Sequence, residues 1–206
     1  AIARSPMPGK THTLKAAIGL KTLKLKPDAI GLCSLLAAKR PNSLVCSYGN
    51  GRVISVAVVA AIAGAGMIVG SMFAFSAFIM AAFRRLEEAE GIRAMQRINE
   101  TVYTPWFMVP FFGTTLLSIG VVVFASMHTD HAWWPTPLAA GLVFVVGVFG
   151  VTAVGNVPLN ERLACMEPSD AASSGFWQHY LVVWTRWNHL RVGLGVISII
   201  LYSSMP

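Results

Sequence analysis

Residues 53–83 read VISVAVVAAIAGAGMIVGSMFAFSAFIMAAF and contain no charged side chain. A helix needs roughly 20 apolar residues to cross a bilayer, and this run is longer. It therefore predicts a transmembrane helix that is tilted or that protrudes from the membrane. Gly64, Gly66 and Gly70 are predicted to lie on one face, with Gly66 and Gly70 in GxxxG spacing. Such a face favours close contact with another helix, in this protein or in a neighbouring subunit.

The chain as a whole has the composition of a membrane protein. Of its 206 residues, 55% are hydrophobic and 12% are charged, and the mean hydropathy is +0.61. Ordinary soluble domains are less apolar. We predict an all-α, integral membrane four-helix bundle with an interfacial amphipathic connector over residues 84–102 and a polar loop over residues 158–175, after Pro158 ends the third span. The predicted spans are residues 53–83, 103–126, 138–157 and 176–202.

The basic charge is concentrated in an N-terminal extension, residues 1–52, which we separate from the transmembrane domain, residues 53–206. All six lysines precede residue 40, and Asp28 is the only acid before residue 53, so the net charge of +7 belongs to the extension. This composition is typical of an organelle transit peptide, and equally of a basic arm on anionic lipid headgroups. Nucleic-acid binding is not expected, because Tyr48 is the only aromatic residue among these charges.

No metal site is predicted. Cys33, Cys46 and Cys165 are odd in number and lack the spacing of metal ligands. His128 and His131 have ligand-like spacing, but in a short interfacial loop we interpret them as solvated residues. Motifs of the common soluble enzymes, such as a phosphate-binding loop or a CxxC pair, do not occur.

Residues 184–191 read WTRWNHLR and place costly polar groups inside the fourth predicted span. At 100° per residue, Tyr180, Trp184, Asn188 and Arg191 fall on one face, with Trp187 beside them. Arg191 lies roughly 20 Å from the C-terminus along the helix, where contact with lipid would cost a few kcal/mol, so it is expected to turn into the bundle. The candidate partners are Gln96, Asn99, Glu100, Asn156, Asn160 and Glu161. Either a polar clasp between helix ends or a substrate pocket with donors for an anionic oxygen fits this pattern.

Three segments resemble the anthrone-oxygenase-like family of small four-helix membrane proteins: IRAMQRINETVYTPWFMVPFFGT at residues 92–114, GNVPLNERL at residues 155–163 and FWQHYLVVWTRWNHLR at residues 176–191. The resemblance covers about residues 60–203. The family's polar positions fall on Gln96, Asn99, Asn156, Asn160, Trp184, Asn188 and Arg191.

The resemblance implies an oxygenase that inserts molecular oxygen into a polyketide anthrone without a metal or flavin. Arg191 and Asn188 would then stabilise the oxygen of the substrate enolate, and His189 would serve as the base. Trp184, Trp187 and Tyr180 would bind the substrate rings.

The sequence leaves two possible functions. We prefer the first, in which the protein is an accessory subunit of a larger photosynthetic or respiratory-chain complex. The complex would lie in an organelle membrane, either the plastid thylakoid or the mitochondrial inner membrane. Residues 1–52 and the glycine face would contact the other subunits. The alternative is a cofactor-independent oxygenase that converts an anthrone-type aromatic polyketide into an anthraquinone. No cofactor is predicted, although a bound lipid or pigment is compatible with the fold.

Overall fold

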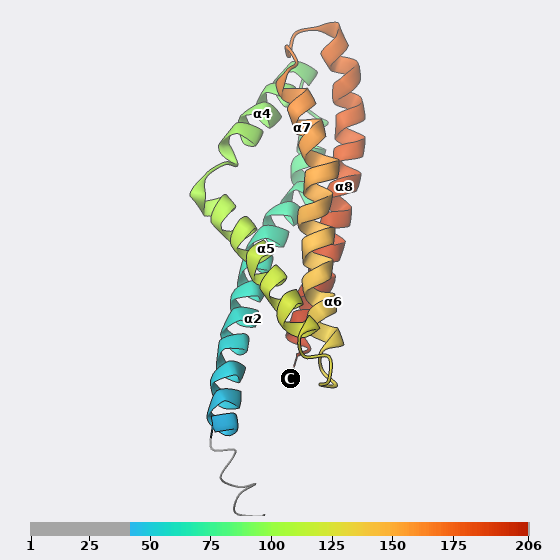
Figure 1. Ribbon diagram of the computed structural model, residues 1–206. Helices are drawn as coiled ribbons and strands as arrows, with labels where there is room; N and C mark the ends of the chain where they lie inside the picture. Colours follow the sequence, from blue (N-terminus) through green and yellow to red (C-terminus); the bar gives the residue numbers. More distant parts are fainter. Residues whose placement is uncertain (1–41, 206) are drawn as a thin grey trace, which may run out of the picture. The chain divides into compact units, whose positions relative to one another are not determined.

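The computed structural model describes residues 42–205, and side chains from residue 55 onward. Contacts divide the chain into two units, Ala1–Tyr48 and Gly49–Pro206, and the second holds all of the described side chains. Most of the extension predicted at residues 1–52 therefore lies outside the described residues. All regular secondary structure in the described part is helical, which confirms the all-α prediction (Figure 1). The helices are α2 (Asn42–Ala74), η1 (Phe75–Ile79), α3 (Met80–Phe83), α4 (Glu88–Thr101), α5 (Pro105–Ser126), α6 (Pro135–Phe144), η2 (Val145–Gly150), η3 (Thr152–Asn156), α7 (Val157–Ala164) and α8 (Ala171–Ser203).

Three described helices are long and apolar enough to cross a membrane: Ser55–Phe83, Pro105–Ser126 and Pro135–Ala164. The chain therefore has the character of an integral membrane protein, as predicted. The predicted number of four spans is not reproduced by length and composition. The fourth predicted span lies in α8, a helix of 33 residues. Its length is sufficient, but four strongly polar residues lower its mean hydropathy: Asn188 and Arg191, which are buried in the bundle, and Arg186 and His189, which are exposed.

The third helix is longer than predicted. Helical structure runs from Pro135 through Ala164, so Pro158 does not end it, and the predicted polar loop over residues 158–175 shrinks to residues 165–170. Pro158 falls in the first turn of α7, directly after the π-helical segment η3. Proline removes one backbone hydrogen bond from the continuous helix, and the π-helical segment η3 just before it is the irregular turn that accommodates this interruption.

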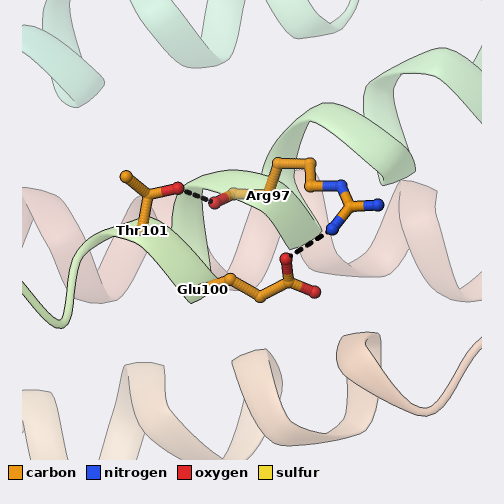
Figure 2. Close-up of polar contacts among 3 residues, drawn as sticks. All are labelled: Arg97, Glu100 and Thr101. Carbon is orange, nitrogen blue, oxygen red and sulfur yellow. Dashed lines mark hydrogen bonds and ion pairs between the residues drawn. The ribbon is translucent and has the colours of Figure 1, made fainter.

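The connector predicted over residues 84–102 contains the helix α4 and is amphipathic, with Ile92 and Met95 buried. Gly91 permits its close approach to α8, because a Cβ atom there would lie 2.7 Å from Cζ2 of Trp177. On the outer face, Arg97 Nη1 donates a hydrogen bond of 2.8 Å to Glu100 Oε2 (Figure 2). Glu100, a candidate partner of Arg191 in the sequence, is thus paired elsewhere.

The glycines of the first span do not share a face, in contrast to the prediction. A Cβ atom at Gly64 would collide with the Thr114 side chain of α5, whereas Gly66 and Gly70 are exposed and have open space at their Cβ positions. Residues two apart on an α-helix are separated by roughly 200°, which explains the difference. Of these three glycines, Gly66 and Gly70 face outward.

Buried side chains form three apolar clusters along the bundle. The first surrounds Trp177, Tyr180 and Trp184 of α8, which pack against residues of α3, α4 and α7. The second and third join α2 and α5 to the α6–η2 helix and to the end of α8. In Figure 1, α6 continues through the π-helical segments into α7 beside α8. This arrangement brings α4 and α5, one after the other along the chain, against the same long helix.

Candidate functional site

A cavity of about 380 Å³ lies between these helices, with walls from α2, η1, α4, α5, η2, η3, α7 and α8. Its volume is within the range of about 300–1,000 Å³ that is usual for small-molecule sites. Five phenylalanines line the cavity and are called the aromatic wall below: Phe75, Phe107, Phe111, Phe112 and Phe149. The polar lining residues are Ser71, Asn99, Tyr103, Thr152, Asn156, Asn160, Asn188 and Arg191, with Trp184 beside them.

All three π-helical segments, η1, η2 and η3, contribute residues to this cavity. Segment η1 supplies Phe75, whose ring lies 5.5 Å from that of Trp184, and η3 supplies Thr152 and Asn156. Short π-helical turns inside α-helices are rare and are frequent at functional sites. Here they place residues that are four apart, Thr152 and Asn156, on the wall of one cavity.

Among the described residues, Arg191 is the only charged side chain in the lining, and it is 5% exposed. Its Nη2 donates a hydrogen bond of 2.6 Å to Asn188 Oδ1, and its Nη1 donates one of 3.1 Å to Thr152 Oγ1. The guanidinium carbon lies 5.4 Å from the centre of the Trp184 ring. The third nitrogen, Nε, is buried without a hydrogen-bond partner among the described residues. Within residues 55–205, Arg191 forms no ion pair with a carboxylate. Glu161, the other acidic candidate partner, is exposed.

Asn188 holds Arg191 against the first span. Its Nδ2 donates hydrogen bonds of 2.7 Å to the Met72 carbonyl and to Ser76 Oγ, and the side chain is fully buried. Since both amide protons are used on α2 and η1, the amide oxygen is left to accept from Arg191. One asparagine therefore fixes the position of the guanidinium and ties α8 to α2.

A second group of hydrogen bonds orients Asn156, Asn160 and Trp184, which also line the cavity. Asn160 Oδ1 accepts from Tyr180 Oη at 2.7 Å and from Trp184 Nε1 at 2.8 Å. Asn156 Nδ2 donates to the Trp184 carbonyl at 3.2 Å, while Asn156 Oδ1 is buried with no partner in the described part of the chain. The carbonyl partner defines the amide orientation, so Asn156 offers an acceptor. Asn99 Nδ2 is a further buried donor that lacks a hydrogen bond to the residues described.

The cavity is built largely from a segment that matches a family model. The family model described as anthrone oxygenase matches residues 102–201, just under half of the chain. The chain contains an anthrone-oxygenase-like domain. The match is shorter than the resemblance over residues 60–203, yet it includes Thr152, Asn156, Asn160, Trp184, Asn188 and Arg191. Comparison with curated proteins and with solved structures gave no match.

Four residues predicted for the site lie outside the lining of this anthrone-oxygenase-like domain. Gln96 Nε2 donates to the carbonyls of Leu163 and Met166, both at 2.9 Å, and so caps the end of α7. Trp187 packs against η3, where a Cβ atom at Gly155 would lie 2.6 Å from its Cδ2. Tyr180 acts on the lining through Asn160. His189 is exposed and lies away from the cavity.

Thr152 and the aromatic wall were not predicted from the sequence. Thr152 accepts from Arg191 and donates a hydrogen bond of 2.6 Å to the Val148 carbonyl. A polar residue four positions before Asn156 in an apolar helix is a signal that could have identified it. The phenylalanines carry no such signal, because in sequence a cavity-facing phenylalanine is indistinguishable from a lipid-facing one.

The histidines of the short loop are placed by aromatic contacts. A ring nitrogen of His128 lies 2.8 Å from the Phe124 carbonyl, and the ring stacks on Phe124 at 4.1 Å. His131 Nε2 lies 3.8 Å from Asp130 Oδ2 and the His131 ring stacks on Trp133. No group of three His, Cys, Asp or Glu side chains in residues 55–205 is arranged to hold a metal ion.

Proposed function

We propose that the anthrone-oxygenase-like domain binds an aromatic anion in its cavity and converts an anthrone-type polyketide into an anthraquinone. The observation that carries this proposal is Arg191, a buried cation with a free Nε–H donor and no carboxylate partner within residues 55–205. An uncompensated charge in a protein interior costs several kcal/mol, even after relaxation. An anionic ligand would remove that cost, whereas a purely structural clasp would leave it in place.

The remaining lining fits a ring system with polar substituents. Phenylalanines and Trp184 offer flat apolar surfaces, and aromatic rings prefer offset or edge-to-face contacts with such surfaces. Asn99 Nδ2 and Asn156 Oδ1 supply one further donor and one acceptor. A hydroxylated anthrone carries carbonyl and hydroxyl groups that satisfy both types of atom.

The proposed reaction needs no electron donor besides the substrate. The anthrone loses a benzylic proton and becomes an anion whose charge extends to its ring oxygen, which Arg191 binds. The anion gives one electron to O₂, and the two radicals join through a new C–O bond. Protonation gives a hydroperoxide, and loss of water leaves the new carbonyl. The CH₂ group supplies all four electrons, one oxygen atom enters the quinone and the other leaves as water.

The protein contributes stabilisation of the anion in this proposal, not a base. The cavity lining contains no histidine or carboxylate among the described residues, and the exposed His189 has no role in it. The positive charge of Arg191 favours the ionised substrate, so the anthrone binds as its anion and no protein base is required for the proton loss. Donors fixed in advance around a developing oxyanion are a major source of catalytic stabilisation.

The test is oxygen uptake by the purified protein in lipid nanodiscs with 1,8-dihydroxyanthrone. Arg191→Gln should lower the rate above the uncatalysed reaction by roughly 100-fold or more, the usual effect of removing one oxyanion donor. Arg186→Gln is the matched control, because Arg186 lies on the same helix but is exposed. Absence of uptake in the parent protein, or equal rates in both variants, would exclude the proposed reaction.

A second candidate function is supported by the composition of residues 1–52. The extension carries nine lysines and arginines against one acid, a pattern that favours contact with an acidic partner or membrane surface. We propose as this alternative an accessory subunit of a photosynthetic or respiratory complex, in the thylakoid or the mitochondrial inner membrane. Gentle detergent extraction of the source membrane tests it. A particle of several fixed subunits that is lost on deletion of residues 1–52 would support it, and a small homogeneous particle would exclude it.

A further inference from the structure

A second space lies next to the cavity, at the junction of α4 and α5. An open groove of about 390 Å³ is lined by Arg97, Ile98, Thr101, Val102 and Phe107. Ile98, Val102 and Phe107 also line the cavity. The two spaces are therefore separated only by these three half-buried apolar side chains.

The polar groups of the groove already bind one another. Arg97 Nη1 donates to Glu100 Oε2 at 2.8 Å, and Thr101 Oγ1 donates to the Arg97 carbonyl at 2.7 Å, as Figure 2 shows. The charge of Arg97 is thus neutralised beside the groove, and the Thr101 hydroxyl proton is used within α4. What the groove offers a ligand is mainly apolar surface. The inner cavity differs, because buried polar atoms there lack partners.

The groove also lies at a suitable depth for a molecule from the bilayer. The cavity places Val102 and Tyr103 near Thr152 and Asn156 of the span Pro135–Ala164. Asn156 is eight residues, or about 12 Å, from the end of that span. Tyr103 and Trp106 beside the groove are 73% and 87% exposed, and such residues gather where hydrocarbon meets headgroups. The exposed Arg97–Glu100 pair on the same helix indicates that the groove opens at the headgroup level, where the ends of lipid chains can reach it.

We propose that the groove binds the aliphatic tail of a ligand whose polar ring occupies the cavity, which makes alkyl-substituted hydroxyarenes from the membrane the substrate class. This inference rests on the proposed function of the cavity. The tail passes Ile98, Val102 and Phe107 and emerges beside Thr101. Transfer of the tail from lipid to the groove replaces one apolar environment by another, so the groove permits the tail and adds little affinity.

The experiment compares binding of 1,8-dihydroxyanthraquinone and its 3-hexyl derivative to the protein in nanodiscs, read from the visible absorbance of the quinone against empty nanodiscs. The unaltered protein should bind the two quinones with dissociation constants that differ by no more than about threefold. Each constant is calculated from the concentration of quinone in the lipid. Thr101→Trp fills the groove without touching the cavity, and it should weaken only the hexyl derivative, by about tenfold or more. Arg97→Trp, at a second residue that lines only the groove, should act in the same way.

Val109→Trp is the control, because Val109 is exposed on α5 and lines neither space. Rejection of the hexyl derivative by the unaltered protein would overturn the tail site. The tail site would also be overturned if each variant, Thr101→Trp and Arg97→Trp, weakened binding of the two quinones equally. The same holds if neither variant changed the affinity for the hexyl derivative. In those cases binding of the unsubstituted quinone leaves the proposed function standing. If neither quinone binds, the cavity does not accept such rings, and both proposals fail together.

Discussion

Replacing Thr152 tests whether the uncompensated charge of Arg191 is what attracts a ligand. Thr152→Asp places a carboxylate next to Arg191 Nη1, which now lies 3.1 Å from Thr152 Oγ1. Thr152→Asn has nearly the same shape without the charge, and both variants lose the hydrogen bond from Thr152 to the Val148 carbonyl. The difference in ligand affinity between the two variants therefore isolates the effect of giving Arg191 a carboxylate partner within the protein.

The expected magnitude follows from Coulomb's law. Two opposite charges about 4 Å apart attract one another by about 4 kcal/mol at an effective dielectric constant of about 20. An anionic ligand loses that attraction once the introduced carboxylate neutralises the guanidinium. If between half and all of it is lost, binding weakens by between about 30-fold and 1,000-fold in Thr152→Asp relative to Thr152→Asn.

The assay uses 1,2-dihydroxyanthraquinone, whose visible colour differs between its neutral and ionised forms. Thr152→Asn should bind the ionised form, whereas Thr152→Asp should bind weakly and without the colour change. The thermal midpoint of Thr152→Asp should be no lower than that of Thr152→Asn, because the new ion pair offsets the desolvation of the carboxylate. Equal affinity of the two variants for the ionised quinone would refute the role given to Arg191.

Two further predictions concern the helix contacts that hold the site. Gly64→Val should lower the thermal midpoint, because its side chain would collide with Thr114, whereas Gly66→Val should have little effect; equal midpoints would contradict the packing of α2 on α5. Gln96→Leu should destabilise the protein by roughly 1–3 kcal/mol in reversible unfolding, because two carbonyls at the end of α7 lose their shared donor. An unchanged unfolding free energy would show that water replaces the amide.

Much of the helical architecture could be predicted because it depends on local composition. Apolar runs set the three spans, and the 100° rotation per residue grouped Trp184, Asn188 and Arg191 on one side of α8. All three residues line the cavity. The predicted end of the third helix at Pro158 was wrong, because a proline in the first turn after a π-helical segment does not break the helix.

Which face of each helix points out of the bundle was harder to predict from the sequence. Gly64 and Gly66 are equally small, but only the packing of α5 against α2 gives Gly64 a neighbour. In the same way, Phe107 and Phe111 line the cavity while Val109, between them, is exposed to the surroundings. Apolar residues of a membrane helix suit both environments, so their identity alone does not distinguish a cavity wall from a lipid-facing surface.

The sequence by itself determined that this is a helical membrane chain and that Arg191 belongs to a polar stripe, because hydropathy and helical periodicity act over short distances along the chain. Only the tertiary structure decided what surrounds that arginine. Thr152 and Asn188 receive its outer donors, Glu161 and Glu100 stay away, and Nε remains free in the described structure. The physical reason is that the electrostatic environment of a buried charge depends on groups brought together from different helices, and their distances are properties of the packing.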